Sequence, residues 1–145
     1  MIIRSIRSVG AVLVGLAVAL ALVIGVEFAS SIVHPFPPGV DPTDIEVCRP
    51  HVARYPAWAL FVASIAWGAT TFVSAWLATR LGSGRRRAHG IVVGLILLAL
   101  AVLNMSMLPY PAWFWASNLI LFPLGFYWGA RLAGPPTSLG RSSAA

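Results

Sequence analysis

Charged residues are scarce in this sequence and of few kinds. Only 10% of the 145 residues are Asp, Glu, Lys or Arg, and all ten basic residues are arginine. Soluble domains average about 25% charged residues. The chain is also 59% hydrophobic, and a soluble domain of this size leaves roughly a third of the unfolded chain's surface in water. The scarcity of charge therefore excludes an ordinary soluble domain and favours an integral membrane protein.

Cysteine is almost absent as well. Cys48 is the single cysteine, so no disulfide within the chain is expected. Acidic, histidine and cysteine side chains do gather between residues 34 and 51, but their spacing fits no recognised metal-ligand pattern. No catalytic motif and no cofactor fingerprint stands out elsewhere. We therefore expect no metal, no cofactor and no enzymatic activity, and we interpret this stretch as a solvated polar loop.

Four apolar segments are long enough to cross a bilayer, whose core of about 30 Å needs roughly 20 helical residues. They cover residues 6–33, 58–81, 91–108 and 112–132. A cleaved signal peptide is an alternative for the first, but its uncharged run is longer than the roughly 7–15 residues typical of one. We expect an all-α fold, a four-helix transmembrane bundle forming one domain. Its connections would be an extracytoplasmic loop, a cytoplasmic loop and a cytoplasmic tail, at residues 34–57, 82–90 and 133–145.

The arginines are distributed unevenly between the two sides of this bundle. One side carries Arg4, Arg7, Arg80, Arg85, Arg86, Arg87, Arg131 and Arg141. The other carries only Arg49 and Arg54, together with three acids. Cytoplasmic loops are rich in arginine and lysine, so we predict that both termini are cytoplasmic in the inner (plasma) membrane of a bacterium. Because the arginines alternate with apolar segments, the net charge of +6 does not indicate nucleic-acid binding.

The long loop contains the signals of one short helix. Asp41 is a suitable N-cap, Pro42 suits the first helical position, and Asp44 complements the positive end of the helix dipole. Pro50 should stop the helix after about Arg49.

Small residues recur every three or four positions in each long segment, which favours close packing of helices in lipid. These stripes are Ala17, Ala21, Gly25 and Ala29; Ser64, Gly68, Thr71, Ala75 and Ala78; Gly90 and Gly94; and Gly125, Gly129 and Ala133. They could also serve a homo-oligomer or a larger membrane complex. Tyr-Pro-Ala-Trp opens two segments, at residues 55–58 and 110–113, so two duplicated helical hairpins are an alternative description of the bundle.

Glu27 is the one acid inside an apolar segment. A charge at bilayer depth costs about 2.5–3.5 kcal/mol even on the lenient insertion scale. We therefore expect Glu27 to face the bundle interior, either protonated or paired. Other polar residues fall at a similar depth, with a histidine at the mouth, and the candidate ligand or proton site is Glu27, Asn104, Asn118, Ser64 and His34. The alternative is a buried hydrogen-bond cluster that aligns the helices.

The stretch from His34 to Asp44, with Asn104, the Pro-Tyr-Pro-Ala-Trp run at 109–113 and the closing residues 129–133, resembles a group of small bacterial four-helix membrane proteins. The resemblance covers Glu27 to about Ala133. It implies the topology above and no particular activity.

Three functions remain open on the sequence. The first is a non-enzymatic structural or accessory component of the membrane, with the lipid bilayer as its environment. The second is a proton-coupled transporter or channel that uses Glu27. The third is a membrane enzyme acting at the outer interface, for which no convincing nucleophile is present.

Overall fold

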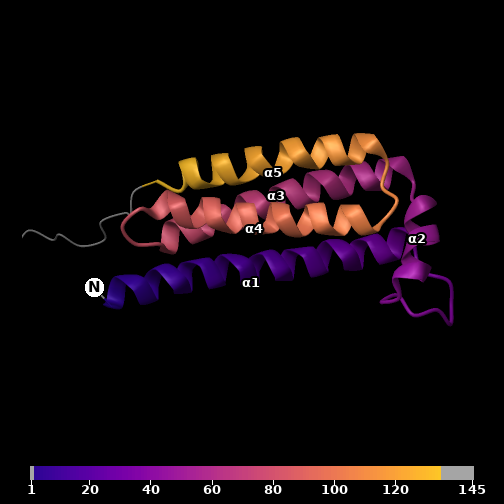
Figure 1. Ribbon diagram of the computed structural model, residues 1–145, viewed down its shortest axis with the longest axis horizontal. Coiled ribbons are helices and arrows are strands. Elements are labelled where there is room, and N and C mark those ends of the chain that lie inside the picture. The colour runs from indigo at the N-terminus through magenta and orange to yellow at the C-terminus, as the bar shows by residue number, and fades with distance from the viewer. Residues whose placement is uncertain (1, 135–145) are drawn as a thin grey trace, which may run out of the picture.

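The computed structural model describes residues 2–134, which form five α-helices (Figure 1). They are α1 (Ile2–Val33), α2 (Ile45–Ala53), α3 (Ala57–Leu81), α4 (Arg86–Met107) and α5 (Ala112–Leu132). The four long helices lie along one another, and α2 lies at one end of them. The predicted all-α class is confirmed for this part of the chain. Most of the predicted tail, with Arg141, lies outside the described residues.

Three of the helices are long and apolar enough to cross a membrane, which is the pattern of a membrane protein. They are Ile3–Val33, Ala57–Leu81 and Arg86–Met107. Helix α5 has a comparable length, but Trp, Tyr and Asn residues lower its mean hydropathy, and it does not belong to this set.

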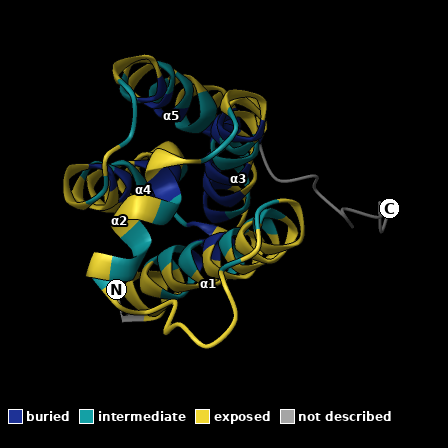
Figure 2. Cartoon of the chain, turned by 90° about the vertical axis from the view of Figure 1, so that its right-hand side faces the viewer, coloured by how far each residue is buried: buried dark blue, intermediate teal, exposed yellow. Residues whose placement is uncertain are grey.

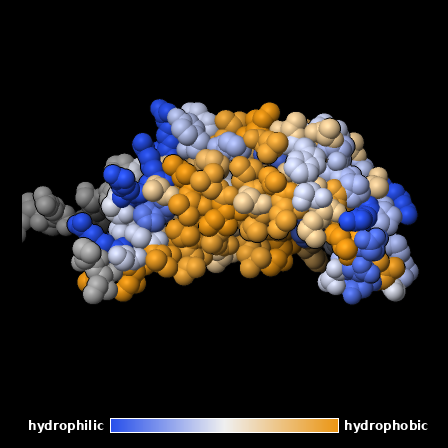
Figure 3. Space-filling model, viewed as in Figure 1, coloured by the Kyte–Doolittle hydropathy of each residue, from blue (hydrophilic) through white to orange (hydrophobic). Residues whose placement is uncertain are grey.

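The distribution of side chains is the reverse of that in a soluble bundle. Large apolar residues such as Leu13, Leu20 and Leu103 are exposed. The interior of α3 is instead built from small or hydroxyl side chains, among them Thr71 and Ser74, both fully buried. Figure 3 shows the apolar surface as a band between two polar ends. Such a surface suits hydrocarbon, because lipid tails solvate it at no cost.

Helix α3 is the centre of the bundle, since it packs against α1, α4 and α5 (Figure 2). The contact with α5 is the most extensive one. A Cβ atom added at Gly125 would lie 2.7 Å from the carbonyl oxygen of Gly68, and one added at Gly129 would collide with the carbonyl oxygen of Phe72. Glycine is thus required where the two backbones meet. The small-residue stripes predicted for α3, α4 and α5 do line helix contacts.

The stripe predicted for α1 is wrong. Ala17, Ala21, Gly25 and Ala29 are all exposed. The buried positions are Ala11, Gly15 and Ala19, and a Cβ atom at Gly15 would lie 3.0 Å from that of Ala78. Both sets repeat every four residues, so spacing could not distinguish them. Beyond Ala19 no residue of α1 is buried, and this half of the helix packs less closely on the bundle.

The short helix of the long loop also differs from its prediction. Its N-cap is Asp44, whose carboxylate accepts a hydrogen bond from the Glu46 amide at 2.9 Å. The Asp41 carboxylate accepts from the Thr43 amide at 2.8 Å and forms a turn before the helix. The helix continues through Pro50 to Ala53. Tertiary contacts described below hold this last turn and outweigh the amide hydrogen bond that Pro50 cannot donate.

Helix α4 begins at Arg86 rather than at Ile91, so the connection from α3 is shorter than predicted. This connection is tied to the first turns of α1, because Arg7 Nε donates to the Leu81 carbonyl at 3.1 Å and Ser83 Oγ donates to the Arg4 carbonyl at 2.9 Å. We name this the arginine end of the bundle, which carries Arg4, Arg7, Arg80, Arg85, Arg86, Arg87 and Arg131. The opposite end, next to α2, is the α2 end.

Replacing Gly129 with alanine should destabilise the protein by about 1–3 kcal/mol, as overpacking of a core does. The new methyl group would meet the backbone of α3, which cannot move aside easily. Thermal unfolding in detergent micelles measures the effect. Gly25→Ala is the matched control, since nothing lies within 4 Å of its added Cβ atom. Equal melting temperatures for the two variants would contradict the proposed α3–α5 contact.

Candidate functional site

A pocket of about 240 Å³ opens at the α2 end, and every helix contributes to its wall. We name it the α2-end pocket. Its polar lining residues are Glu27, Ser30, Ser31, His34, Cys48, His51, Tyr55, Trp67, Asn104 and Tyr110. Its apolar lining residues are Phe36, Pro42, Val52, Leu60, Ala63, Leu108 and Phe114.

A cluster of aromatic rings closes the pocket on the side of α2. The His51 ring stacks on Phe36 at a centroid distance of 3.8 Å and lies 4.2 Å from the ring of His34. His34 Nε2 lies 3.3 Å from the His51 carbonyl oxygen, and Tyr55 Oη donates to the Ser30 carbonyl at 3.3 Å. These contacts join the end of α1 to the last turn of α2 and account for the continuation of α2 past Pro50.

A second aromatic group forms the wall nearest to α5. Phe114 is fully buried, stacks on Tyr110 at 4.5 Å and meets the edge of Trp67 at 5.5 Å. The indole nitrogen of Trp67 is buried and has no hydrogen-bond partner. An unpaired buried donor in a pocket wall is available to a ligand or a water molecule.

Three titratable side chains that line the pocket, His51, Tyr110 and Cys48, have pKa values shifted toward their neutral forms. Burial, and then the proximity of His34, lower the pKa of His51 below its ordinary value of 6.5. Burial, and next the charge of Glu27, raise the pKa of Tyr110 well above 10.0. Burial raises the pKa of the Cys48 thiol, with the carboxylates of Asp44 and Asp41 adding to it. None of these three groups is therefore charged at neutral pH.

The structure brings together three of the five residues predicted as a site. Glu27, His34 and Asn104 all line the α2-end pocket. The side chains of Glu27 and Asn104 are exposed at its rim. Glu27 was expected to face the bundle interior, but the bundle does not enclose it, because the second half of α1 packs loosely.

Ser64 and Asn118 form a separate pair and do not line this pocket. Both are fully buried between α3 and α5, where Asn118 Nδ2 donates to Ser64 Oγ at 3.2 Å and to the Phe114 carbonyl at 2.8 Å. These two residues therefore match the alternative of a buried hydrogen-bond cluster and do not belong to the pocket. The sequence places all five candidate residues at a similar depth in the membrane. The structure shows that the side chains of Ser64 and Asn118 point toward the α3–α5 interface.

The pocket residues that were not predicted include His51, Tyr55, Trp67 and Tyr110. A signal for two of them was present, since both tyrosines open the repeated Tyr-Pro-Ala-Trp motif. The repeat opens two of the predicted apolar segments, and each tyrosine does precede a helix whose N-cap is the following proline. The same position also directs both rings into the pocket.

Between residues 2 and 134, no group of three or more His, Cys, Asp or Glu side chains could hold a metal ion. Cys48 lies at the pocket edge, where its Sγ donates to the Pro42 carbonyl at 3.3 Å.

Comparison of the chain with protein-family models, curated proteins and solved structures found no match.

The free energy of unfolding should fall as the pH decreases through 6.5. His51 then takes up a proton in the unfolded chain, whereas its lowered pKa keeps it neutral in the folded chain. The loss should level off below the lowered pKa of folded His51. Unfolding measured from pH 8 to pH 5 in micelles checks this. The variant His51→Phe keeps a ring on Phe36 and should flatten the profile. His89→Gln, at the arginine end, should leave it unchanged, and an unaltered profile in His51→Phe would contradict the assignment.

Proposed function

We propose that the protein is a non-enzymatic, multi-pass protein of the bacterial inner (plasma) membrane that binds a small organic cation in the α2-end pocket. The observation that carries this proposal is the lining of the pocket. Glu27 is the one acidic residue that lines the pocket, and no arginine lines it.

The electrostatics of the pocket favour a cation. His51 is held neutral, so it adds no positive charge at neutral pH to oppose a cation beside Glu27. Aromatic rings of Tyr110, Phe114 and Trp67 line the pocket, and an aromatic ring attracts a quaternary ammonium group wherever its face is accessible. A carboxylate combined with an aromatic wall is a common arrangement for alkylammonium recognition. Inorganic cations would prefer several oxygen ligands.

The function as an accessory component is consistent with this pocket. Neither Ser31 nor Cys48 is an activated nucleophile, since Ser31 Oγ donates to the Phe28 carbonyl within its own helix and the raised pKa of Cys48 keeps its thiol protonated. A binding site of this kind would suit a small subunit that senses or presents a ligand, alone, as a homo-oligomer or within a larger complex. We also propose that the protein is related to the small bacterial four-helix membrane proteins that its sequence resembles.

Helix α5 is, in this proposal, the fourth span. It has 21 residues, close to the roughly 20 that a bilayer requires, and it runs beside α3 and α4 (Figure 1). Trp113 lies near its start, and Tyr127 and Trp128 near its end. Aromatic residues at both ends are typical of membrane interfaces. The arginine end would then face the cytoplasm and the α2 end the outside.

Cysteine labelling tests this orientation. In a Cys48→Ser background, a cysteine introduced by Val40→Cys should react with an impermeant maleimide added to intact cells. One introduced by Ala88→Cys should react only after the membrane is permeabilised. Both positions are exposed in the structure. The reverse pattern of labelling would contradict the orientation.

Glu27→Gln should weaken binding of choline, used as the probe, by roughly tenfold or more, because the cation loses its counter-charge. Isothermal titration on the purified full chain in detergent measures this. Wild-type protein should bind the uncharged analogue 3,3-dimethyl-1-butanol far more weakly than choline.

Glu46→Gln is the matched control, since it removes an exposed acid that pairs with Arg49 at 3.4 Å outside the pocket. It should leave choline binding unchanged. Equal affinity for choline and its uncharged analogue, or equal losses in the two variants, would refute the cation site.

A proton-coupled transporter or channel is the second candidate, favoured by a carboxylate in a spanning helix that borders a pocket. Under this alternative, Glu27→Gln would abolish pH-dependent flux in proteoliposomes while the protein remains folded. The pocket is confined to the α2 end, which fits ligand binding more directly than passage across the bilayer.

A further inference from the structure

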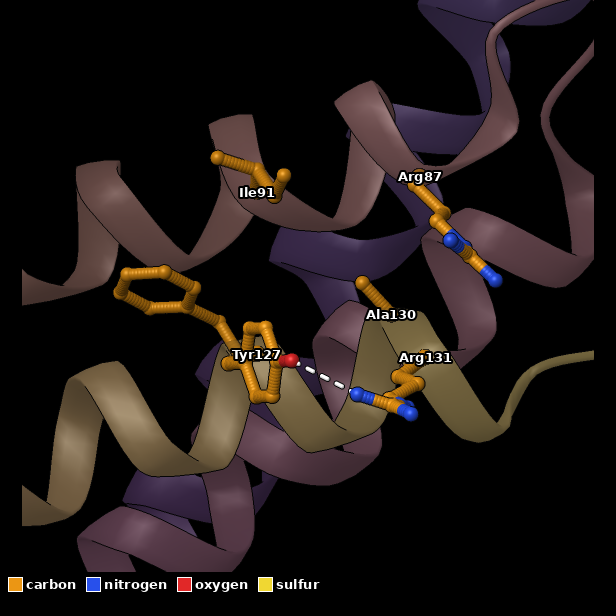
Figure 4. A pocket seen from close by; sticks show the side chains of 6 residues that line it. Arg87, Ile91, Tyr127, Ala130 and Arg131 are labelled. Carbon is orange, nitrogen blue, oxygen red and sulfur yellow. Dashed lines mark hydrogen bonds between the residues drawn. The ribbon is translucent and has the colours of Figure 1, made fainter.

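A second pocket, of about 350 Å³, lies at the arginine end between α4 and α5. Its wall consists of Arg87 and Ile91 from α4 and Phe126, Tyr127, Ala130 and Arg131 from α5 (Figure 4). We name it the α4–α5 pocket. It shares no lining residue with the α2-end pocket.

Two arginines line this pocket, and contacts with aromatic side chains hold one of them, Arg131. Arg131 Nη1 donates to the hydroxyl of Tyr127 at 2.8 Å, and its guanidinium lies over the ring of Trp128 at 5.5 Å. Arg87 comes from the first turn of α4 and extends toward the same gap (Figure 4). The Tyr127 contact uses one guanidinium nitrogen, so other donors of Arg131 remain free to bind an anion.

No acidic side chain of the described residues balances these charges. The four acids of the sequence are Glu27, Asp41, Asp44 and Glu46, and none belongs to the arginine end. Within residues 2–134 the one ion pair, between Arg49 and Glu46, lies at the α2 end. Two guanidinium groups that line one pocket repel one another, and an anion bound there would relieve this repulsion.

The inner part of the pocket is apolar. Ile91 lies one turn deeper along α4 than Arg87, and Phe126 one turn deeper along α5 than Ala130. Behind them the helices close together, because a Cβ atom at Gly94 would overlap the side chain of Phe126. The pocket thus passes from cationic at the bundle end to hydrocarbon toward its middle.

We propose that the α4–α5 pocket binds the headgroup of an anionic phospholipid, with its phosphate between Arg87 and Arg131 and the start of an acyl chain against Ile91 and Phe126. Paired arginines bind phosphate oxygens through several N–H donors at once. Basic pockets between membrane helices are a known means of holding anionic headgroups. A free phosphate would use the arginines but leave the apolar part of the pocket empty.

The test is a titration of the purified full chain in uncharged detergent, followed by native mass spectrometry. Phosphatidylglycerol is the anionic probe and phosphatidylcholine the zwitterionic one. Wild-type protein should bind phosphatidylglycerol preferentially, and an excess of inorganic phosphate should not displace it. The double variant Arg87→Gln/Arg131→Gln should bind it roughly tenfold or more weakly. Both side chains are exposed, so the fold should tolerate these changes.

The matched control is Arg4→Gln/Arg85→Gln, which removes the same charge from exposed arginines at the same end that do not line the pocket. It should leave binding nearly unchanged. Ile91→Trp keeps every arginine but fills the pocket, and it should also weaken binding. Equal losses in the two double variants, full affinity in Ile91→Trp, or displacement by inorganic phosphate would each overturn the lipid site.

Discussion

The close approach of α3 and α5 is the contact on which the bundle depends. It exists because Gly125 and Gly129 carry no side chain where they meet the backbone of α3 at Gly68 and Phe72. Lipid supplies no hydrophobic drive that would press helices together, so their association relies on dispersion contacts and on a few hydrogen bonds between helices. The buried pair of Asn118 and Ser64 lies in this same interface and is best regarded as part of what aligns the two helices.

The α2-end pocket follows from how unequally α1 is packed. At Gly15 this helix touches α3 and α4, but from residue 20 onward none of its side chains is buried. Polar groups then occupy the space that a tightly packed helix would have filled with small residues. Glu27 is tolerated there because it reaches the rim near the end of a long helix: 32 residues extend about 48 Å, well beyond a hydrocarbon core of about 30 Å.

Charge is separated along the bundle, and the two pockets differ accordingly. All acids lie toward the α2 end, where the α2-end pocket is lined by one carboxylate and by neutral groups. Arginines crowd the other end, where the α4–α5 pocket is lined by two of them. A distribution that serves to orient a chain in its membrane would thus also give each face of the membrane a site of opposite preference: cations at one end and phosphate at the other.

The all-helical class, the approximate bounds of the long helices and the small-residue contacts of α3, α4 and α5 could all be predicted from the sequence. These features depend on local composition and on spacing along one helix, which the linear chain displays. The packing face of α1 could not be predicted from the sequence. Residues 11, 15 and 19 have the same period as residues 17, 21 and 25, and only the partner helix selects between the two sets. The end of α2 and the division of the five polar residues into a pocket and a buried pair were likewise decided by tertiary structure. Depth in a membrane can be counted along a sequence, but the direction in which a side chain points around its helix is determined by the neighbours against which that helix packs.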